Sequence, residues 1–314
     1  MTKSKLNLNI RKDKGEGIWH YSSYLAFVLE KYRLSLNEGN TPEIPIEEEL
    51  ILKREDLNPT GSLKDRGMAF LISLAYSKGL KKLVISSSGN AAISAAKYCE
   101  IIGLDLNIFV SPKISEEKRK ALQNTKAVLH FSGRTVSDSI KFAKENNFFN
   151  LRPSTNEFGP EAYQTIAFET LQNQGLIEDI FIPSSSGVSL MGIAKGFKKF
   201  GLLPRIHVCQ SSAVCPIAAK FVSDFKKEEE SLAKALVAKT TPLRDEIIKT
   251  VKESGGTGWV IANQEIVHAQ KILAQKNIET SEEGALALAA AYKARQKEFK
   301  LGKTVCLLTG KKYK

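Results

Sequence analysis

NPTGSLKDRG, residues 58–67, is the stretch on which the interpretation of this sequence depends. It places a lysine, Lys64, directly after a Pro-Thr-Gly-Ser turn, with Asp65 and Arg66 beside it and an apolar, helix-like run behind it. The ordinary alternative is a solvated lysine that pairs with Asp65. A lysine buried at the start of a helix would instead have a lowered pKa and a nucleophilic amine. The rest of the sequence indicates whether Lys64 is a solvated lysine or a buried, nucleophilic one.

On both sides of this stretch, apolar β-prone runs alternate with segments of helical periodicity. The predicted strands lie at residues 50–53, 81–86, 104–112, 126–133, 178–183, 205–210 and 304–310. Helical patterns follow most of them, and residues 225–257 are interpreted as a helix plus a mobile loop. Strands that alternate with helices are typical of parallel sheets built from βαβ units. The sequence therefore predicts an α/β protein.

Three of the predicted turns between a strand and a helix have an unusual composition. PTGSLK (59–64), SSSGN (86–90) and SSSGV (184–188) each combine hydroxyl residues with glycine just before a helix. Ligands of α/β proteins bind at the carboxyl ends of the strands, and the free N–H groups of helix N-termini attract anions. A single turn of this kind is also how an ordinary capped helix looks. Three of them, together with Lys64, favour one shared binding site.

Bulk composition fits a globular enzyme and gives little support to other classes. The chain has 314 residues and a formal charge of +12, with basic residues interleaved with acidic ones, as on solvated helix faces. We therefore expect no nucleic-acid partner, although a basic protein also attracts small anions. No apolar run approaches the ~20 residues of a membrane helix. We expect no membrane partner, no secretory signal and a cytoplasmic location.

The cysteines and histidines give no metal-binding pattern. The four cysteines are scattered without a CxxC pair, and the four histidines show neither HxxxH nor HExxH spacing. In a chain of this length such cysteines are typically reduced and buried rather than paired. The sequence therefore predicts no metal site.

A series of motifs in chain order gives the sequence a family resemblance. These motifs are EGNTP (38–42), KREDLNPTGSLKDRGM (53–68), SSSGNAAISAA (86–96), PSSSGVSLMG (183–192) and LLTG (307–310). The series resembles the pyridoxal-phosphate enzymes of the tryptophan-synthase-β fold (fold type II), and among them the threonine synthases. The resemblance implies two domains with mostly parallel twisted sheets flanked by helices. Residues 1–67 and 156–314 would form the large cofactor-binding domain, and residues 68–155 a small mobile substrate domain.

The resemblance also implies roles for individual residues. Lys64 would carry pyridoxal 5'-phosphate as a Schiff base and later move protons as the catalytic acid and base. Asn90 would hydrogen-bond the phenolic oxygen of the cofactor, and Thr309 would face its pyridine nitrogen, although either residue could be an ordinary turn residue. The cofactor phosphate would lie against the segment that consists of Ser184, Ser185, Ser186, Gly187, Val188 and Ser189. The substrate would contact Ser62, Ser87, Ser88, Gly89, Arg152, Ser154 and Asn156.

Two positions depart from the family pattern. Val188 stands where relatives often have glycine in the phosphate loop, and Gly159 stands where threonine synthases have a phosphate-binding arginine. The second departure removes a charge-assisted contact to a substrate phosphate. Arg152, seven residues upstream, is a candidate replacement. Otherwise, the substrate would lack that phosphate.

Three functional hypotheses follow. The first is a threonine synthase, which eliminates phosphate from Cγ of O-phosphohomoserine and adds water at Cβ. The second is another enzyme of the same fold, either a threonine or serine dehydratase or a β-replacement enzyme. The third is a binding protein without catalysis, which would not need Lys64 and Asn90 together. Most relatives are dimers, so a homodimer is the expected assembly.

Overall fold

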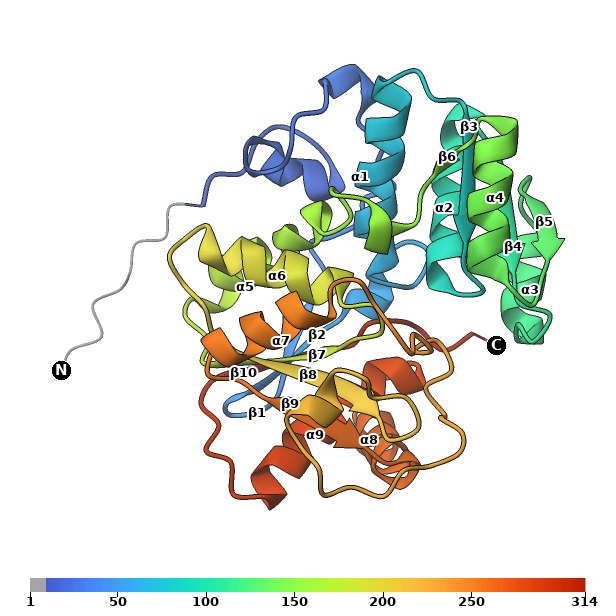
Figure 1. Ribbon diagram of the computed structural model, residues 1–314. Coiled ribbons are helices and arrows are strands. Elements are labelled where there is room, and N and C mark those ends of the chain that lie inside the picture. The colour runs from blue at the N-terminus through green and yellow to red at the C-terminus, as the bar shows by residue number, and fades with distance from the viewer. Residues whose placement is uncertain (1–9, 314) are drawn as a thin grey trace.

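The computed structural model describes residues 10–313 and shows two lobes, each built on its own β-sheet (Figure 1). The larger lobe has a six-stranded sheet in the order β1-β2-β10-β7-β8-β9, and the smaller lobe has a four-stranded sheet in the order β5-β4-β3-β6. All neighbouring strands run parallel except β1 and β2, which form an antiparallel pair at the edge of the large sheet. The predicted α/β class with mostly parallel sheets is confirmed.

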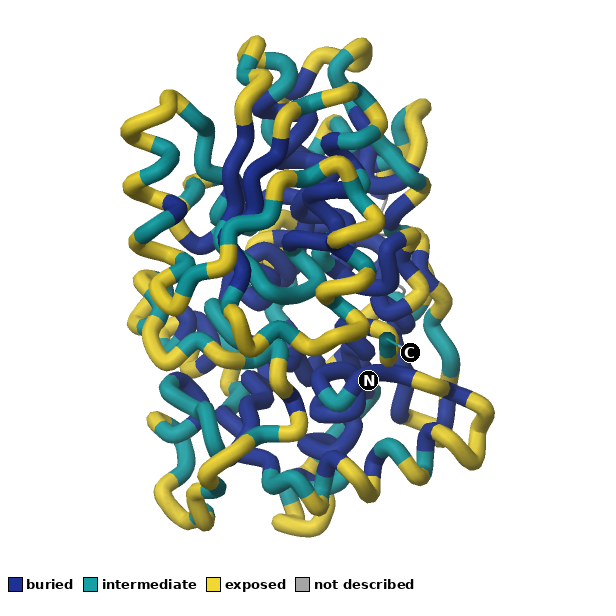
Figure 2. The backbone as a smooth tube through the Cα atoms, turned by 90° about the vertical axis from the view of Figure 1, so that its right-hand side faces the viewer, coloured by how far each residue is buried: buried dark blue, intermediate teal, exposed yellow. Residues whose placement is uncertain are grey.

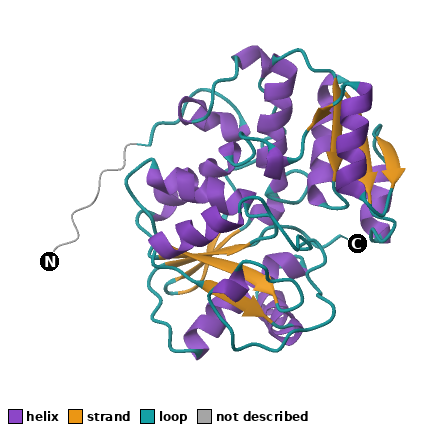
Figure 3. Ribbon diagram, in the orientation of Figure 1, coloured by secondary structure: helices purple, strands orange, loops and turns teal. Residues whose placement is uncertain are grey.

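The large sheet is covered by helices on both faces (Figure 3). Its strands are β1 (Glu43–Glu47), β2 (Leu50–Lys53), β7 (Asp179–Pro183), β8 (Arg205–Ser211), β9 (Gly258–Ile261) and β10 (Thr304–Leu307). One face carries α5 (Gln164–Gln174), α6 (Val188–Lys198) and α7 (Arg244–Glu253), and the other carries α8 (Asn263–Gln275) and α9 (Glu282–Gln296). Because successive strand side chains point to opposite faces, Ile180 and Ile182 pack under α5 and α6 while Phe181 packs toward α9.

The small sheet is likewise sandwiched between helices. Its strands are β3 (Lys82–Ser86), β4 (Asp105–Val110), β5 (Val128–Phe131) and β6 (Phe149–Asn150). The helices of this part of the chain are α1 (Lys64–Ser77), α2 (Asn90–Ile102), α3 (Glu116–Gln123) and α4 (Thr135–Asn146). The side chains of α1 and α2 share a core with Leu83 and Ile85 of β3. On the opposite face, Phe142 of α4 packs against Phe109 of β4.

Short 3₁₀ helices connect these elements. They are η1 (Gly17–Tyr24), η2 (Glu30–Tyr32), η3 (Glu55–Leu57), η4 (Pro153–Thr155), η5 (Glu161–Tyr163) and η6 (Ala218–Lys220). Ile18 and Trp19 of η1 belong to the same hydrophobic core as α1, α2 and the small sheet. Ile10 and Tyr21 instead belong to the core of the large sheet. The N-terminal segment therefore packs against both lobes, and the proposed division at residues 68 and 155 remains a prediction.

The seven strands expected from the sequence are all present, and two kinds of element were not anticipated. The first kind is the short or edge strands β1, β6 and β9, and the second is the helices α5 and α8. Of residues 225–257, the helical part is α7, whereas residues 225–243 form neither helix nor strand. The predicted mobility of this loop remains a prediction. No helix within residues 10–313 is both long and apolar enough to span a membrane.

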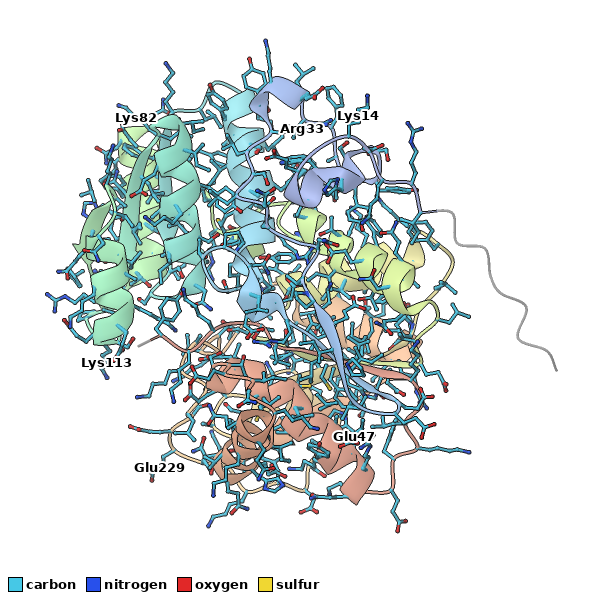
Figure 4. The ribbon with its side chains drawn as sticks, turned by 180° about the vertical axis from the view of Figure 1, so that it is seen from behind. Lys14, Arg33, Glu47, Lys82, Lys113 and Glu229 are labelled. Carbon is cyan, nitrogen blue, oxygen red and sulfur yellow. The ribbon has the colours of Figure 1, made fainter. Side chains whose placement is uncertain are left out.

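Buried residues run through the interior of both lobes, and exposed residues lie at the periphery (Figure 2). Seen from behind, Lys82 and Lys113 lie on the smaller lobe, and Glu47 and Glu229 lie on the larger lobe (Figure 4). Charges of both signs are thus present on the surface, in keeping with their interleaving in the sequence.

A buried cluster of charged side chains fixes α1 to the large lobe. The Arg66 guanidinium donates to both oxygens of Glu55 at 2.8 and 2.7 Å and to both oxygens of Glu169 at 2.6 and 2.8 Å. Lys53 donates to the same Glu169 carboxylate at 2.6 Å. These side chains are almost completely excluded from solvent. Their mutual attraction lowers the carboxyl pKa of both Glu55 and Glu169 and raises the pKa of Arg66, although burial acts in the opposite direction on each group.

The substitution Glu169→Gln tests how strongly this cluster holds the fold. It leaves Arg66 and Lys53 buried with fewer negative partners, and breaking a buried ion pair costs roughly 3–5 kcal/mol. Urea unfolding should show that loss of unfolding free energy. The matched control is Lys97→Gln, which breaks an exposed Lys97–Glu100 pair and should change stability by less than about 1 kcal/mol. Equal effects of the two substitutions would contradict a structural role of the cluster.

Candidate active site

The turn of residues 58–67 folds back on itself before α1 begins. Gly61 has a φ of +96°, a left-handed conformation that favours glycine. The Thr60 backbone N–H and hydroxyl both donate to the Asp65 carboxylate, at 2.7 and 2.5 Å. Asp65 is buried, and its carboxylate oxygens accept these hydrogen bonds within the turn. The alternative in which Lys64 pairs with Asp65 in solvent is therefore not what the structure shows.

The same turn is bonded to the segment that follows β10 at the C-terminal end of the chain. The Leu63 N–H donates to the Thr309 carbonyl at 3.1 Å, and the Lys311 N–H donates to the Gly61 carbonyl at 2.8 Å. Ser62 and Gly310 form an isolated antiparallel bridge. Two motifs about 250 positions apart in the sequence thus lie side by side, between the lobes (Figure 1).

Lys64 is the first residue of α1, and its amine has no carboxylate partner within the described part of the chain. Its Nζ lies 5.7 Å from the ring centroid of the buried Tyr163. Burial alone lowers the pKa of the Lys64 amine to about 8. At a pKa of about 8, roughly a tenth of this amine is neutral, and so nucleophilic, at pH 7.

Asn90 begins α2, and its amide lies against the same C-terminal segment. A Cβ at Gly310 would stand 2.8 Å from Asn90 Nδ2, so a side chain there would displace the Asn90 amide. The Asn90 Oδ1 atom is buried without a hydrogen-bond partner in the structure. Because buried polar atoms are nearly always paired, this orphaned oxygen and its amide indicate a place where a ligand belongs.

The serine-rich turn, residues 184–187, leads from β7 into α6. Gly187 has a φ of +85° and provides no side-chain cap for the helix, and the Ser184 hydroxyl is buried without a partner. In contrast, Ser115 and Ser281 cap α3 and α9 through their side chains. The N–H groups at the start of α6 are thus left for another acceptor. Val188 and Ser189 form the first turn of α6 and are buried.

Thr309 is brought close to this serine-rich turn by strand pairing. Cys306 of β10 pairs with Phe181 of β7 in a parallel register, so the segments that follow the two strands emerge next to each other at the carboxyl edge of the sheet. Thr309 is itself buried. The structure therefore gathers Lys64, Asn90, Thr309 and the serine-rich turn in one region between the lobes.

The other serine-containing turn precedes Asn90. The Ser87 hydroxyl accepts from the Gly89 N–H at 3.2 Å, and the Ser88 hydroxyl accepts from the Ser111 N–H at 2.6 Å, so both hydroxyls support the turn itself. A Cβ at Gly89 would meet no atom within 4 Å. Open space therefore lies beside the backbone of Gly89, where a ligand carboxylate was predicted.

Arg152 and Ser154 lie at the carboxyl edge of the small sheet. Leu151 donates its N–H to Val84 of β3, so Arg152 follows directly alongside the end of β3. The Arg152 Nε donates to the Ser154 hydroxyl at 2.9 Å, and partial burial lowers the pKa of Arg152. Asn156 uses its side-chain oxygen to accept from the Phe158 N–H at 2.9 Å, which leaves its amide N–H₂ as the group that can meet a ligand.

Gly159 is a position that admits no side chain. A Cβ there would overlap the carbonyl oxygen of Pro153, because the loop of residues 153–159 closes tightly on itself. The arginine that the family resemblance places here is therefore incompatible with this backbone. Arg152 directly precedes this loop, and its role as a replacement for that arginine remains a prediction.

Two contacts in this region were not predicted from the sequence. Tyr163 fills the space beside Gly67, where a Cβ would stand 2.5 Å from its hydroxyl, and that hydroxyl has no hydrogen-bond partner. The pairing of Arg66 with Glu169 spans 103 positions. In the sequence, Gly67 at the end of KDRG was the one indication that another residue packs closely against this helix. No sequence pattern specified which residue that neighbour is.

Residues 34–310 match the family of pyridoxal-phosphate dependent enzymes, and the chain belongs to that family. It is similar to the threonine synthase of Methanocaldococcus jannaschii, with 28% identity over 87% of this chain and 74% of the relative. It is also similar to the threonine synthase of Halalkalibacterium halodurans, with 29% identity over 92% of this chain and 87% of the relative. In fold it resembles maize serine racemase, with a TM-score of 0.75, 20% identity and coverage of 86% and 88% of the two chains. The predicted fold type and the predicted cofactor are both confirmed.

The residues present fit pyridoxal phosphate. The cofactor has an aldehyde, a phenolic oxygen, a ring nitrogen and a phosphate. The structure offers the Lys64 amine, the unpaired Asn90 side chain, the Thr309 segment and the uncapped start of α6, all in one region. Within residues 10–313, no group of three His, Cys, Asp or Glu side chains is arranged to hold a metal ion.

The lowered pKa of Lys64 can be checked in the cofactor-free protein. Below its pKa the amine carries a proton and does not attack acylating reagents, so the rate of Lys64 acylation should rise with pH and be half-maximal near pH 8. The measurement is pulse labelling with acetic anhydride at a series of pH values, with the Lys64 peptide quantified by mass spectrometry. Exposed lysines in the same digest should follow the ordinary value of ~10.4. A midpoint near that value for Lys64 would show that burial does not affect this amine.

Proposed function

We propose that this chain is a threonine synthase, a pyridoxal-phosphate-dependent lyase that converts O-phosphohomoserine and water to threonine and phosphate. The observation that carries the proposal is the partly buried Lys64 amine, which is desolvated and has no carboxylate partner within residues 10–313. It begins α1 behind the turn whose Ser62 bridges to Gly310, and Gly310 in turn lies against the orphaned side chain of Asn90. The similarity to threonine synthases over most of the chain favours this reaction among those of the family. The proposal includes the cytoplasmic location that the sequence composition favoured and the homodimer that the resemblance implied.

Lys64 would bind the cofactor and exchange protons with the substrate. Bound pyridoxal phosphate supplies an electron sink, which makes protons at Cα and Cβ of an attached amino acid removable. A pKa near 8 allows the Lys64 amine both to take up and to return a proton near neutral pH. Asn90 would orient the phenolic oxygen. The Thr309 hydroxyl would face the ring nitrogen and, being neutral, would not force it to stay protonated.

Other groups would bind the substrate. The backbone N–H groups at Ser87, Ser88 and Gly89 would hold its carboxylate in the open space beside Gly89, with Ser62 and Asn156 on its other sides. Arg152, supported by Ser154, would hold the substrate phosphate. In the overall reaction the Cγ–O bond breaks and phosphate leaves with the bonding electrons. Cβ loses one proton and gains hydroxyl from water, Cγ gains one proton to become a methyl group, and Cα regains the proton that it lost. The remaining proton goes to phosphate.

The second candidate is another enzyme of the same fold, a threonine or serine dehydratase or a β-replacement enzyme. Gly159 favours it, because the close contact with the Pro153 carbonyl excludes the arginine expected in a threonine synthase. The two candidates therefore differ in whether Arg152 receives a substrate phosphate. A binding protein without catalysis is disfavoured, since such a protein would not need Lys64 and Asn90 together.

A substrate screen that follows phosphate and keto acid together distinguishes the candidates. A threonine synthase should release one phosphate per threonine from O-phosphohomoserine, and Lys64→Ala should abolish the release. Arg152→Ala should raise KM for this substrate roughly tenfold or more, because a hydrogen bond to a charged group contributes about 1.5–3 kcal/mol. The control is Arg134→Ala, which removes an exposed arginine of the same lobe and should leave KM unchanged.

Two results would contradict the proposal. Keto-acid formation from serine or threonine without phosphate release would identify a dehydratase. An unchanged KM in the Arg152→Ala variant, alongside normal phosphate release, would show that this arginine does not replace the missing one.

A further inference from the structure

An irregular segment, residues 238–243, lies against the serine-rich turn and is called the clamp segment below. The Ala238 N–H donates to the Ser185 hydroxyl at 3.1 Å, and the Thr241 hydroxyl donates to the Ser186 carbonyl at 2.7 Å. These bonds join positions 53 and 55 apart in the chain. The clamp segment has no helix or strand of its own, so its shape depends on such contacts.

The clamp segment is in turn anchored to α7. The Leu243 N–H donates to the Thr241 hydroxyl oxygen at 3.3 Å, and Leu243 is the residue directly before α7. One turn further, Ile247 packs so closely on Gly187 that a Cβ at this glycine would overlap the isoleucine side chain. Thr241 therefore links the residue before α7 to the serine-rich turn. A second contact between α7 and this turn is made by Ile247, which packs on Gly187.

These contacts fix the direction of the N–H groups in the turn. The peptide unit is planar and trans, so the carbonyl of Ser186 and the N–H of Gly187 point in opposite directions. Because Thr241 holds the carbonyl, the Gly187 N–H is turned away from the clamp segment. The Ser185 hydroxyl accepts from Ala238, which leaves its own proton free to donate elsewhere. The turn thus presents the Gly187 N–H on the side away from the clamp segment, and the Ser185 hydroxyl proton remains available as a second donor.

We propose that the clamp segment sets the affinity for the cofactor phosphate, with Thr241 as the positioning residue. This inference rests on the proposed placement of that phosphate at the serine-rich turn. A turn already held in its binding conformation loses less conformational freedom when the phosphate binds. Thr241 does not touch the phosphate in this account. It acts through the Ser186–Gly187 peptide.

The test compares two cofactor forms that differ only in the phosphate. The dissociation constants of pyridoxal 5'-phosphate and of pyridoxal are measured by absorbance for the full-length protein and for the variant Thr241→Val. One lost hydrogen bond predicts about three- to tenfold weaker binding of pyridoxal phosphate. Binding of pyridoxal, which reacts with Lys64 but has no phosphate, should stay unchanged.

Matched controls separate positioning from general damage. Thr240→Val makes the same change at an exposed neighbour and should leave both constants unchanged. Thr241→Ser retains the hydroxyl and should bind pyridoxal phosphate like the unaltered protein. Thr241→Ala removes the same hydroxyl and serves as a second test variant should the valine variant not fold.

The outcomes are distinct. Unchanged affinity of the Thr241 variants for pyridoxal phosphate overturns the inference, and so does an equal loss of affinity for both cofactor forms. If the unaltered protein binds pyridoxal phosphate no more tightly than pyridoxal, the phosphate is not held at the turn, and the inference fails while catalysis through Lys64 remains possible. If it binds neither form, the proposed function fails as well.

Discussion

The buried ion cluster of Arg66 with Glu55 and Glu169 is the constraint on which the site depends. Charged groups leave water at a high cost, which is recovered only when each one meets good partners. Here each oxygen of both carboxylates accepts from the guanidinium at 2.6–2.8 Å. The cluster holds the first turn of α1 against η3 and α5, and that turn carries Lys64.

The neighbours of Lys64 explain why its amine differs from that of a surface lysine. Asp65 is occupied by Thr60, and Arg66 takes both nearby glutamates. No negative charge is left over to favour the ammonium form of Lys64, so burial alone acts on its pKa. Lys64, Asp65 and Arg66 are three adjacent charged residues in the sequence. In the structure Asp65 and Arg66 are paired with other groups, whereas the Lys64 amine has a lowered pKa and is available to react.

The sequence was informative where a local pattern determines the structure. Apolar runs such as residues 178–183 became central strands, because their side chains alternate between two covered faces. The three hydroxyl- and glycine-rich turns became the starts of α1, α2 and α6. The strands β6 and β9 were missed, because two to four residues carry little periodicity. The helix α5 was missed because it is buried nearly all round and has no amphipathic pattern.

The long-range contacts of the site were beyond sequence reasoning. The fit of Tyr163 against Gly67, the overlap that excludes a side chain at Gly159, and the bond from Thr241 to Ser186 each depend on how distant segments meet. The local sequence preferences of a segment do not determine which distant segment it contacts. The family resemblance supplied roles for Lys64 and Asn90, whereas the structure supplied the physical reasons why those residues suit these roles.

The most direct test of the account is to locate the cofactor on the chain. The protein is incubated with pyridoxal 5'-phosphate, reduced with borohydride, digested and mapped by mass spectrometry. The account predicts one phosphopyridoxyl group per chain, on the peptide that contains Lys64. A group attached mainly to other lysines, or no attachment under conditions that retain the folded protein, would contradict it.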